Sequence, residues 1–232
     1  KDLEIVSDIS WKLASDDLLS KTQMVLCGFD TRGTMTFIDQ NGEQKTRPIK
    51  PEETVWRSYE QFFTNNYKNV SPDYLKFLNK WSNEDDSKFR DEPYRRVWTK
   101  HISTYATNYN MMDISLAPLV ESKFNEVKSQ LKVIEAGFHK KALIAQNFGP
   151  YTIDLVNARV KGGKFNPKGN GFLIDSNRNH KKWYQTVKYL IQNPNLIKDV
   201  GERLYEDVSS KYHLKVTTEK RKQIYEEIIK RG

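Results

Sequence analysis

The chain has 232 residues, of which 37% are hydrophobic and 12% aromatic, so it is long and apolar enough to bury a core. This composition excludes an intrinsically disordered chain, and no apolar run approaches the ~18 residues that a membrane-spanning helix needs. A formal net charge of +8 favours an anionic partner, which could be nucleic acid, an acidic membrane face or a phosphorylated small molecule. The single cysteine, Cys27, excludes an internal disulfide, and four scattered histidines lack the spacing of a metal site.

The chain opens with a helix followed by a strand. Asp2 is expected to cap a helix that carries Val6, Ile9 and Leu13 at helical spacing. Residues 23–28 then predict a buried strand that ends at a glycine. Because this is the pattern of the middle of an α/β fold, we expect a further strand and an N-terminal domain before Lys1.

Residues 31–96 interrupt the alternation. Strands over 34–39 and 43–49, joined by the turn Asn41–Gly42, predict a β-hairpin. Two aromatic-rich helices follow, over 55–63 and 74–81, and then a charged stretch over 83–96. We expect this segment to be an insertion packed against the main domain, without a core of its own.

The alternation resumes at Val97. It predicts a helix over 103–109, a helix over 125–138, three final helices, and strands over 113–117, 142–146 and 171–175. Strands that alternate with helices predict an α/β fold, a Rossmann-like parallel sheet of about four to six strands with helices on both faces. We therefore expect residues 1–232 to form a single domain with the insertion at about 31–96.

The predicted helix over 125–138 carries two side-chain stripes. One is apolar and expected to be buried, and consists of Val127, Leu131, Ile134 and Phe138. The neighbouring stripe consists of Lys128, Lys132 and Glu135. Lysines in the first turns of a helix oppose its dipole at a cost of about 0.3–1 kcal/mol each, so local stability does not explain them. They are consistent either with a bound diphosphate, whose ribose would reach Glu135, or with a solvated polar face.

A resemblance to a known family rests on several segments in order. They are Asp113–Pro118, Phe124–Asn125, Lys128–Ser129, Lys132, Glu135–Ala136, Ala142–Ala145 and Gly149–Tyr151, followed by Gly171–Asp175 and Asn193–Pro194. Together they resemble the C-terminal donor domain of the retaining "group 1" glycosyltransferases of GT-B fold, of the bacterial polysaccharide-biosynthesis type. The resemblance covers roughly residues 1–30 and 97–230 and leaves the insertion unexplained.

The resemblance implies roles for six residues. Glu135 occupies the place of the glutamate that binds the nucleotide's ribose, at the end of the family's E-x7-E motif. The first glutamate of that motif would fall at Val127 and is absent, with Glu126 one residue away. The chain instead resembles a subgroup with F-N-x-x-K-S-x-x-K-x-x-E, which implies phosphate or sugar contacts for Asn125, Lys128, Ser129 and Lys132. Trp98 lies where such domains place the nucleobase, and its alternative role is that of a core tryptophan.

The implied activity is transfer of a hexose from a nucleotide-sugar to a glycan or lipid-linked acceptor. Such an enzyme needs no metal or cofactor, because lysines and a helix dipole neutralise the departing diphosphate. The acceptor would bind the missing N-terminal domain, so this chain alone is expected to bind the donor and transfer little. The expected location is cytoplasmic, with peripheral contact to the inner membrane face as an addition.

Two other functions stay open. The missing first glutamate is consistent with a non-catalytic module that binds a nucleotide-sugar without turnover. The net charge is consistent with a basic α/β protein that binds nucleic acid, but no stripe of interleaved basic and aromatic residues supports it, so no nucleic-acid partner is expected.

Overall fold

The computed structural model describes residues 2–29, 33–50, 53–64, 72–73, 76, 91–159, 164–175 and 179–231. The chain divides into two compact units. One consists of Val6–Asn108, and the other of Lys1–Ile5 together with Tyr109–Gly232.

The unit Val6–Asn108 is built on a parallel pair of strands. β1 (Met24–Phe29) pairs with β4 (Tyr94–Trp98), with Met24 opposite Tyr94. In the described part of this unit, α1 (Ile9–Ser15) and α2 (Val55–Thr64) contact one another. A buried ion pair joins α2 to β4, since Arg96 Nε lies 3.3 Å from Glu60 Oε1 and both side chains are 0% exposed. β4 corrects the sequence analysis, which assigned most of these residues to a charged stretch.

A β-hairpin leads away from β1. β2 (Thr34–Ile38) and β3 (Gln44–Pro48) are antiparallel, and Gly42 in the turn has a φ of +80°. Glycine adopts that left-handed conformation without strain. The antiparallel pairing of the two strands confirms the predicted hairpin. The predicted helix over 74–81 lies outside the described residues apart from residue 76.

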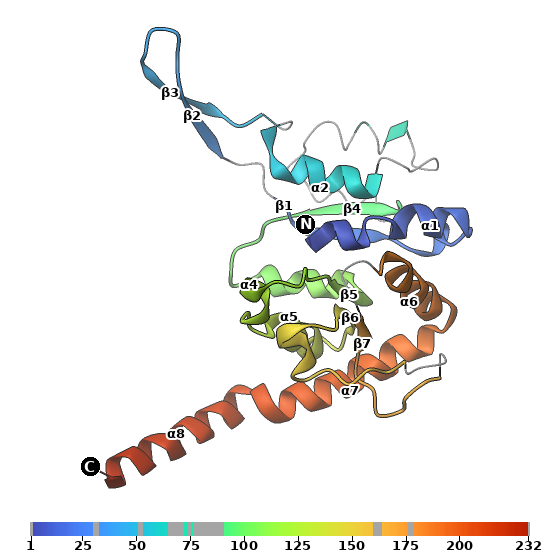
Figure 1. The fold of residues 1–232 in the computed structure, drawn as a ribbon, viewed down its shortest axis with the longest axis vertical. Coiled ribbons are helices and arrows are strands. Elements are labelled where there is room, and N and C mark those ends of the chain that lie inside the picture. The colour runs from blue at the N-terminus through green and yellow to red at the C-terminus, as the bar shows by residue number, and fades with distance from the viewer. Residues whose placement is uncertain are drawn as a thin grey trace. The chain divides into compact units, whose positions relative to one another are not determined.

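The other unit contains a three-stranded parallel sheet in the order β5 (Ile114–Ala117), β6 (Ala142–Gln146), β7 (Phe172–Ile174). All three strands are confirmed predictions. Its helices are α4 (Lys123–Glu126), α5 (Leu131–Phe138), α6 (His180–Gln192), α7 (Pro194–Tyr212) and α8 (Leu214–Arg231). In Figure 1, α7 passes beside α5 and β6, and α8 continues from it.

The core of this unit lies between β6, α5 and α7. It is lined by buried side chains that include Leu143 and Ala145 of β6, Val133 and Ala136 of α5, and Leu204 and Val208 of α7. Two glycines allow the close approach: a Cβ on Gly137 would come within 2.5 Å of Val208, and one on Gly201 within 2.2 Å of the Lys140 carbonyl oxygen. This packing fixes α5, and therefore the segment before it, relative to the sheet.

The expected single sheet needs correction. We expected the strands around Met24 and Ile114 to share one sheet, but β1 pairs with β4 whereas β5 pairs with β6. The sequence concealed β4 because the basic pair Arg95–Arg96 made it appear solvated, although Arg96 is buried against Glu60. The coarser prediction, an α/β chain with parallel sheets flanked by helices, is confirmed. That the whole chain forms one domain with an insertion stays a prediction.

Candidate functional site

The candidate site lies where the three parallel strands of the second unit end. The carboxyl end of β5 leads through Pro118–Ser122 into α4, that of β6 leads into a 3-10 helix over Gly149–Thr152, and that of β7 leads to Asp175. Two of these segments are linked, because Asn147 Nδ2 donates a hydrogen bond to Asp175 Oδ1 at 2.5 Å. In parallel α/β sheets this edge is where ligands bind.

Asn125 and Gly149 hold the first two loops together. The side chain of Asn125 is buried and donates a hydrogen bond to the Val120 carbonyl oxygen at 2.7 Å. Gly149 has a φ of +54°, and a Cβ there would lie 3.2 Å from the Asn125 carbonyl oxygen. Asn125 therefore shapes the loop after β5, and its predicted ligand contact stays a prediction.

The predicted helix over 125–138 is in fact two helices. Ser122 caps α4 by accepting a hydrogen bond from the Asn125 N–H, and α4 ends at Glu126. α5 begins at Leu131, so Lys128 and Ser129 lie in the connection between them. Packing explains why the helix is broken here. If α5 continued toward the N-terminus, the positions on the same face as the buried Val133 would all be polar. Those residues are Gln130, Ser129 and Glu126.

The predicted apolar stripe is corrected as well. Val127 is 82% exposed and Leu131 is 51% exposed, whereas α5 buries Val133, Ala136 and Gly137. Extrapolating one helical period through the break assigned the wrong face to Val127 and Leu131.

The structure brings Lys132 and Glu135 together on α5. Lys132 Nζ lies 3.0 Å from Glu135 Oε2, and the same oxygen accepts a hydrogen bond from Tyr109 Oη at 2.9 Å. The Glu135 side chain is only 10% exposed, while that of Lys132 is 54% exposed. Glu135 is therefore held in place by two donors and is not part of a fully solvated helix face.

Lys128 lies one turn before α5. It is exposed, and its Nζ lies 5.1 Å from the centroid of the Phe124 ring, which is itself 75% exposed. Ser129 is exposed beside it. A cation and a hydroxyl thus immediately precede α5, where the first N–H groups of a helix favour an anion.

Tyr151 lies near both Glu135 and Asp2, and the sequence analysis assigned neither Tyr151 nor Asp2 to the site. Burial raises the pKa of the Tyr151 phenol, and the negative charges of Asp2 and Glu135 raise it further. Tyr151 therefore stays a neutral hydrogen-bonding group at physiological pH. Asp2 in turn accepts a hydrogen bond from the Val120 N–H at 2.9 Å. No local sequence signal identified them, because each contact joins segments distant in the chain.

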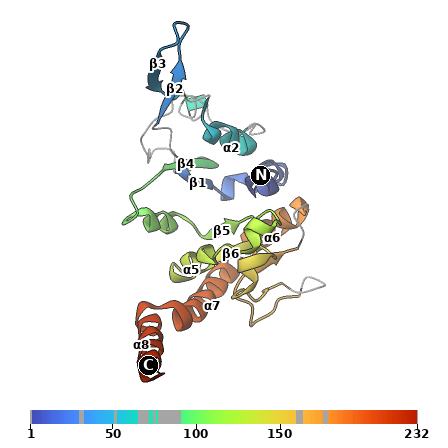
Figure 2. The ribbon, with the colours of Figure 1, turned by 60° about the vertical axis from the view of Figure 1, so that its left-hand side comes forward.

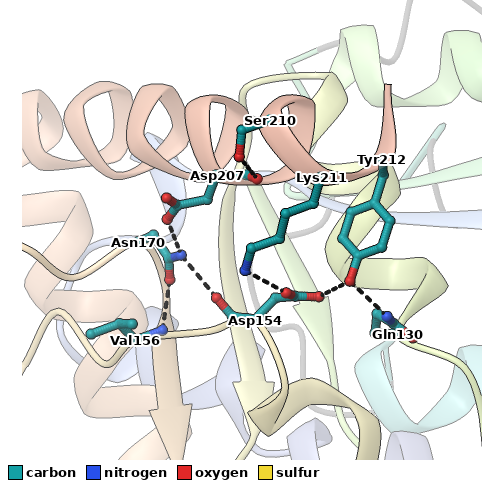
Figure 3. A network of polar contacts seen from close by, with 8 residues as sticks. All are labelled: Gln130, Asp154, Val156, Asn170, Asp207, Ser210, Lys211 and Tyr212. Carbon is teal, nitrogen blue, oxygen red and sulfur yellow. Dashed lines mark hydrogen bonds and ion pairs between the residues drawn. The ribbon is translucent and has the colours of Figure 1, made fainter. Parts of the chain in front are cut away.

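A polar network joins the start of α5 to α7, and Figure 3 shows its members. The carboxylate of Asp154 is 3% exposed and accepts from Lys211 Nζ at 2.8 Å and from Tyr212 Oη at 2.7 Å. Tyr212 Oη also accepts a hydrogen bond from Gln130 Nε2 at 2.9 Å. Because Gln130 is the N-cap residue of α5, the network ties the start of that helix to the end of α7.

The remaining predicted contact is on the other unit. Trp98 is the last residue of β4 and partly buried, and it belongs to Val6–Asn108. Its predicted contact with the nucleobase stays a prediction.

Comparison with known proteins gives no family, since no protein-family model matches the chain and no curated protein matches it either. The described residues contain no cluster of His, Cys, Asp and Glu that could hold a metal ion. Of the helices in the described part of the chain, none combines the length and apolar character needed to cross a bilayer.

The described arrangement has a clear chemical character. Two exposed ammonium groups, Lys128 and Lys132, lie at the start of α5, and a mostly buried carboxylate, Glu135, lies one turn further along and pairs with Lys132. Ammonium groups bind phosphate oxygens, and a carboxylate accepts hydrogen bonds from hydroxyl groups. A ligand that carries both phosphate and hydroxyl groups therefore matches this combination of two ammonium groups and one carboxylate.

Proposed function

We propose that the chain is the nucleotide-sugar-binding part of a retaining, metal-independent GT-B glycosyltransferase that transfers a hexose to a glycan or lipid-linked acceptor. The observation that carries the proposal is Glu135, a carboxylate in the helix between β5 and β6 that accepts hydrogen bonds from both Tyr109 and Lys132. The order of motifs that resembles the family's donor domain supports it from the sequence. The cytoplasmic location, with contact to the inner membrane face, belongs to this proposal.

In this proposal the segment Lys128–Lys132 binds the diphosphate. The ammonium groups of Lys128 and Lys132 and the first N–H groups of α5 compensate the negative charge that grows on the diphosphate as it leaves. Glu135 accepts hydrogen bonds from the ribose hydroxyls, while Tyr109 keeps its carboxylate in one orientation. Asn125 and Ser129 complete the phosphate or sugar contacts.

A second candidate is a module that binds the nucleotide-sugar without turnover. The observation that favours it is the residue at the place of the missing first glutamate, Val127, which is 82% exposed and cannot accept a hydrogen bond from the sugar. Single-turnover assays with the full-length protein separate this candidate from the enzyme, because the module binds donor but forms no glycoside.

The test is calorimetric titration of the chain with a panel of nucleoside diphosphates. We expect Lys128→Ala to weaken diphosphate binding roughly ten- to a hundredfold, and to change nucleoside binding less, because a charge-assisted contact contributes about 1.5–3 kcal/mol. Glu135→Ala should weaken both ligands. Lys198→Ala is a matched control, because it also removes one exposed lysine, but from α7 and not from α5. Lys198 lies three residues before Gly201, the residue at which α7 packs against the chain that precedes β6.

The proposal fails if Lys128→Ala and Glu135→Ala bind the preferred nucleotide as tightly as the Lys198→Ala control. It also fails if no nucleoside diphosphate binds. Binding of oligonucleotides with a steep salt dependence would instead support the nucleic-acid alternative.

A further inference from the structure

α8 carries an extensive apolar surface that the rest of its unit does not cover. None of its residues is buried, and five large apolar side chains are more than half exposed. They are Leu214 (74%), Ile224 (54%), Tyr225 (64%), Ile228 (60%) and Ile229 (77%). In Figure 1 and again in Figure 2, α8 extends away from the β5–β7 sheet.

These apolar residues lie on one side of the helix. With 3.6 residues per turn, they fall within an arc of about 140°, which we call the α8 apolar face. The other apolar residue of α8, Val216, lies outside it. Such a concentration is typical of a helix whose apolar face meets a partner or a lipid surface.

The charged residues of α8 are sorted around this face. Arg221 lies close to its middle, and four further cations lie along its two edges. On one edge are Lys215 and Lys222, and on the other are Lys220 and Arg231. The helix's acidic residues, Glu219, Glu226 and Glu227, lie toward the opposite side, together with Lys230. The side that carries the apolar residues is therefore also the positive side.

This arrangement favours a lipid surface over a protein partner. In a protein interface, Arg221 would be buried in the centre of an apolar contact and would need a buried acidic partner. At a membrane surface its guanidinium can bind lipid phosphates while the neighbouring isoleucines enter the acyl boundary. The lysines along both edges can extend to the headgroups in the same way.

From this geometry we propose that α8 binds flat on an anionic membrane surface through its apolar face and the cations around it. The net charge of +8 on the chain adds long-range attraction to such a surface. It deepens the membrane contact that belongs to the proposed function, but it does not depend on the nucleotide site, because it rests on α8 alone.

The test is co-sedimentation of the chain with vesicles of phosphatidylcholine alone, or with about one-third phosphatidylglycerol. We expect binding to be at least about tenfold tighter on the anionic vesicles. The double substitution Ile228→Ser with Ile229→Ser should reduce that binding at least about tenfold, because it removes apolar groups from the face.

A matched pair of substitutions tests the orientation of the helix. Arg221→Gln and Lys230→Gln each remove one positive charge, but only Arg221 lies on the proposed face. We expect Arg221→Gln to weaken binding to anionic vesicles about fivefold and Lys230→Gln less than about twofold. Circular dichroism of each variant checks that α8 remains helical.

Three results overturn the proposal. One is a failure to bind anionic vesicles, and a second is binding that survives the isoleucine substitutions or falls equally with Arg221→Gln and Lys230→Gln. The third is a dimer in sedimentation velocity that the isoleucine substitutions convert to monomer, because a second copy of the chain then covers the face.

Discussion

α7 and α8 follow one another in the chain and are nearly the same length, 19 and 18 residues, but they bury very different surfaces. α7 buries Val200, Gly201, Leu204 and Val208, which follow one another at helical spacing toward α5 and β6. α8 buries none of its residues. Both helices are amphipathic, so an apolar stripe alone does not decide whether a helix packs.

The two helices also differ in the residue that interrupts the apolar stripe. In α7 the interruption is Gly201, whose missing side chain lets the helix approach the backbone at Lys140. In α8 it is Arg221, a cation whose burial against an apolar neighbour would cost desolvation free energy. A glycine in the stripe therefore indicates a helix that packs within its own domain. An arginine there indicates a helix that meets a polar boundary.

The largest effect is expected from a matched pair of leucines, one on each helix. Leu204 is 0% exposed and Leu214 is 74% exposed. Leu204→Ala should lower the free energy of unfolding by about 3 kcal/mol, because it leaves a cavity between α7 and α5. Leu214→Ala should change it by less than about 0.5 kcal/mol. Urea unfolding of both variants measures the difference, and equal effects would show that the two helices are packed alike.

A smaller effect is expected at the junction of the two helices, where α7 ends at Tyr212. Tyr212→Phe removes the hydroxyl that joins Gln130 to Asp154 and should lower the free energy of unfolding by about 1 kcal/mol at neutral pH. Lys211, the other donor to Asp154, remains as an internal reference. A variant as stable as wild type would show that the network does not anchor α7.

The same variant has a signature at alkaline pH. Burial raises the pKa of Tyr212, and the hydrogen bond to Asp154 raises it further. A raised pKa means that the contribution of Tyr212 to stability is present below its ordinary pKa of about 10 and is lost as the pH rises through the higher value of the folded state. Wild type should therefore lose more stability than Tyr212→Phe between about pH 9 and pH 11 in urea unfolding series. Parallel pH profiles would contradict this.

The sequence predicted the parts of the fold that depend on local pattern. The strand Ala142–Gln146 is a short apolar run, and Asn41–Gly42 is a typical hairpin turn, so both were correct. The pattern failed where burial depends on distant residues. Arg96 is buried because Glu60 compensates its charge. The residues of β4 alone could not predict this burial, because Glu60 lies in a distant segment of the chain.

The candidate site shows the same limit. Lys132 and Glu135 are close together on one helix, so their spacing predicted that they share one face, on which the structure pairs them. The third member, Tyr109, lies 26 residues before Glu135, and no periodicity connects the two. The break before α5 was missed because Leu131 and Val127 continue the helical spacing, although neither is buried. Packing against α7 selects Val133, Ala136 and Gly137 instead.

The smallest expected effect comes from removing the interruption in α8. Arg221→Leu would make the apolar face of α8 continuous, while leucine and arginine have similar helix propensities. If α8 lacks packing because nothing in the chain faces it, the free energy of unfolding should change by less than about 0.5 kcal/mol. If the arginine alone prevents packing, the variant should be more stable by about 1 kcal/mol or more, since a buried leucine contributes about 1.5–3 kcal/mol. Measuring urea unfolding at two protein concentrations separates packing within one chain from self-association, because only self-association makes stability depend on concentration.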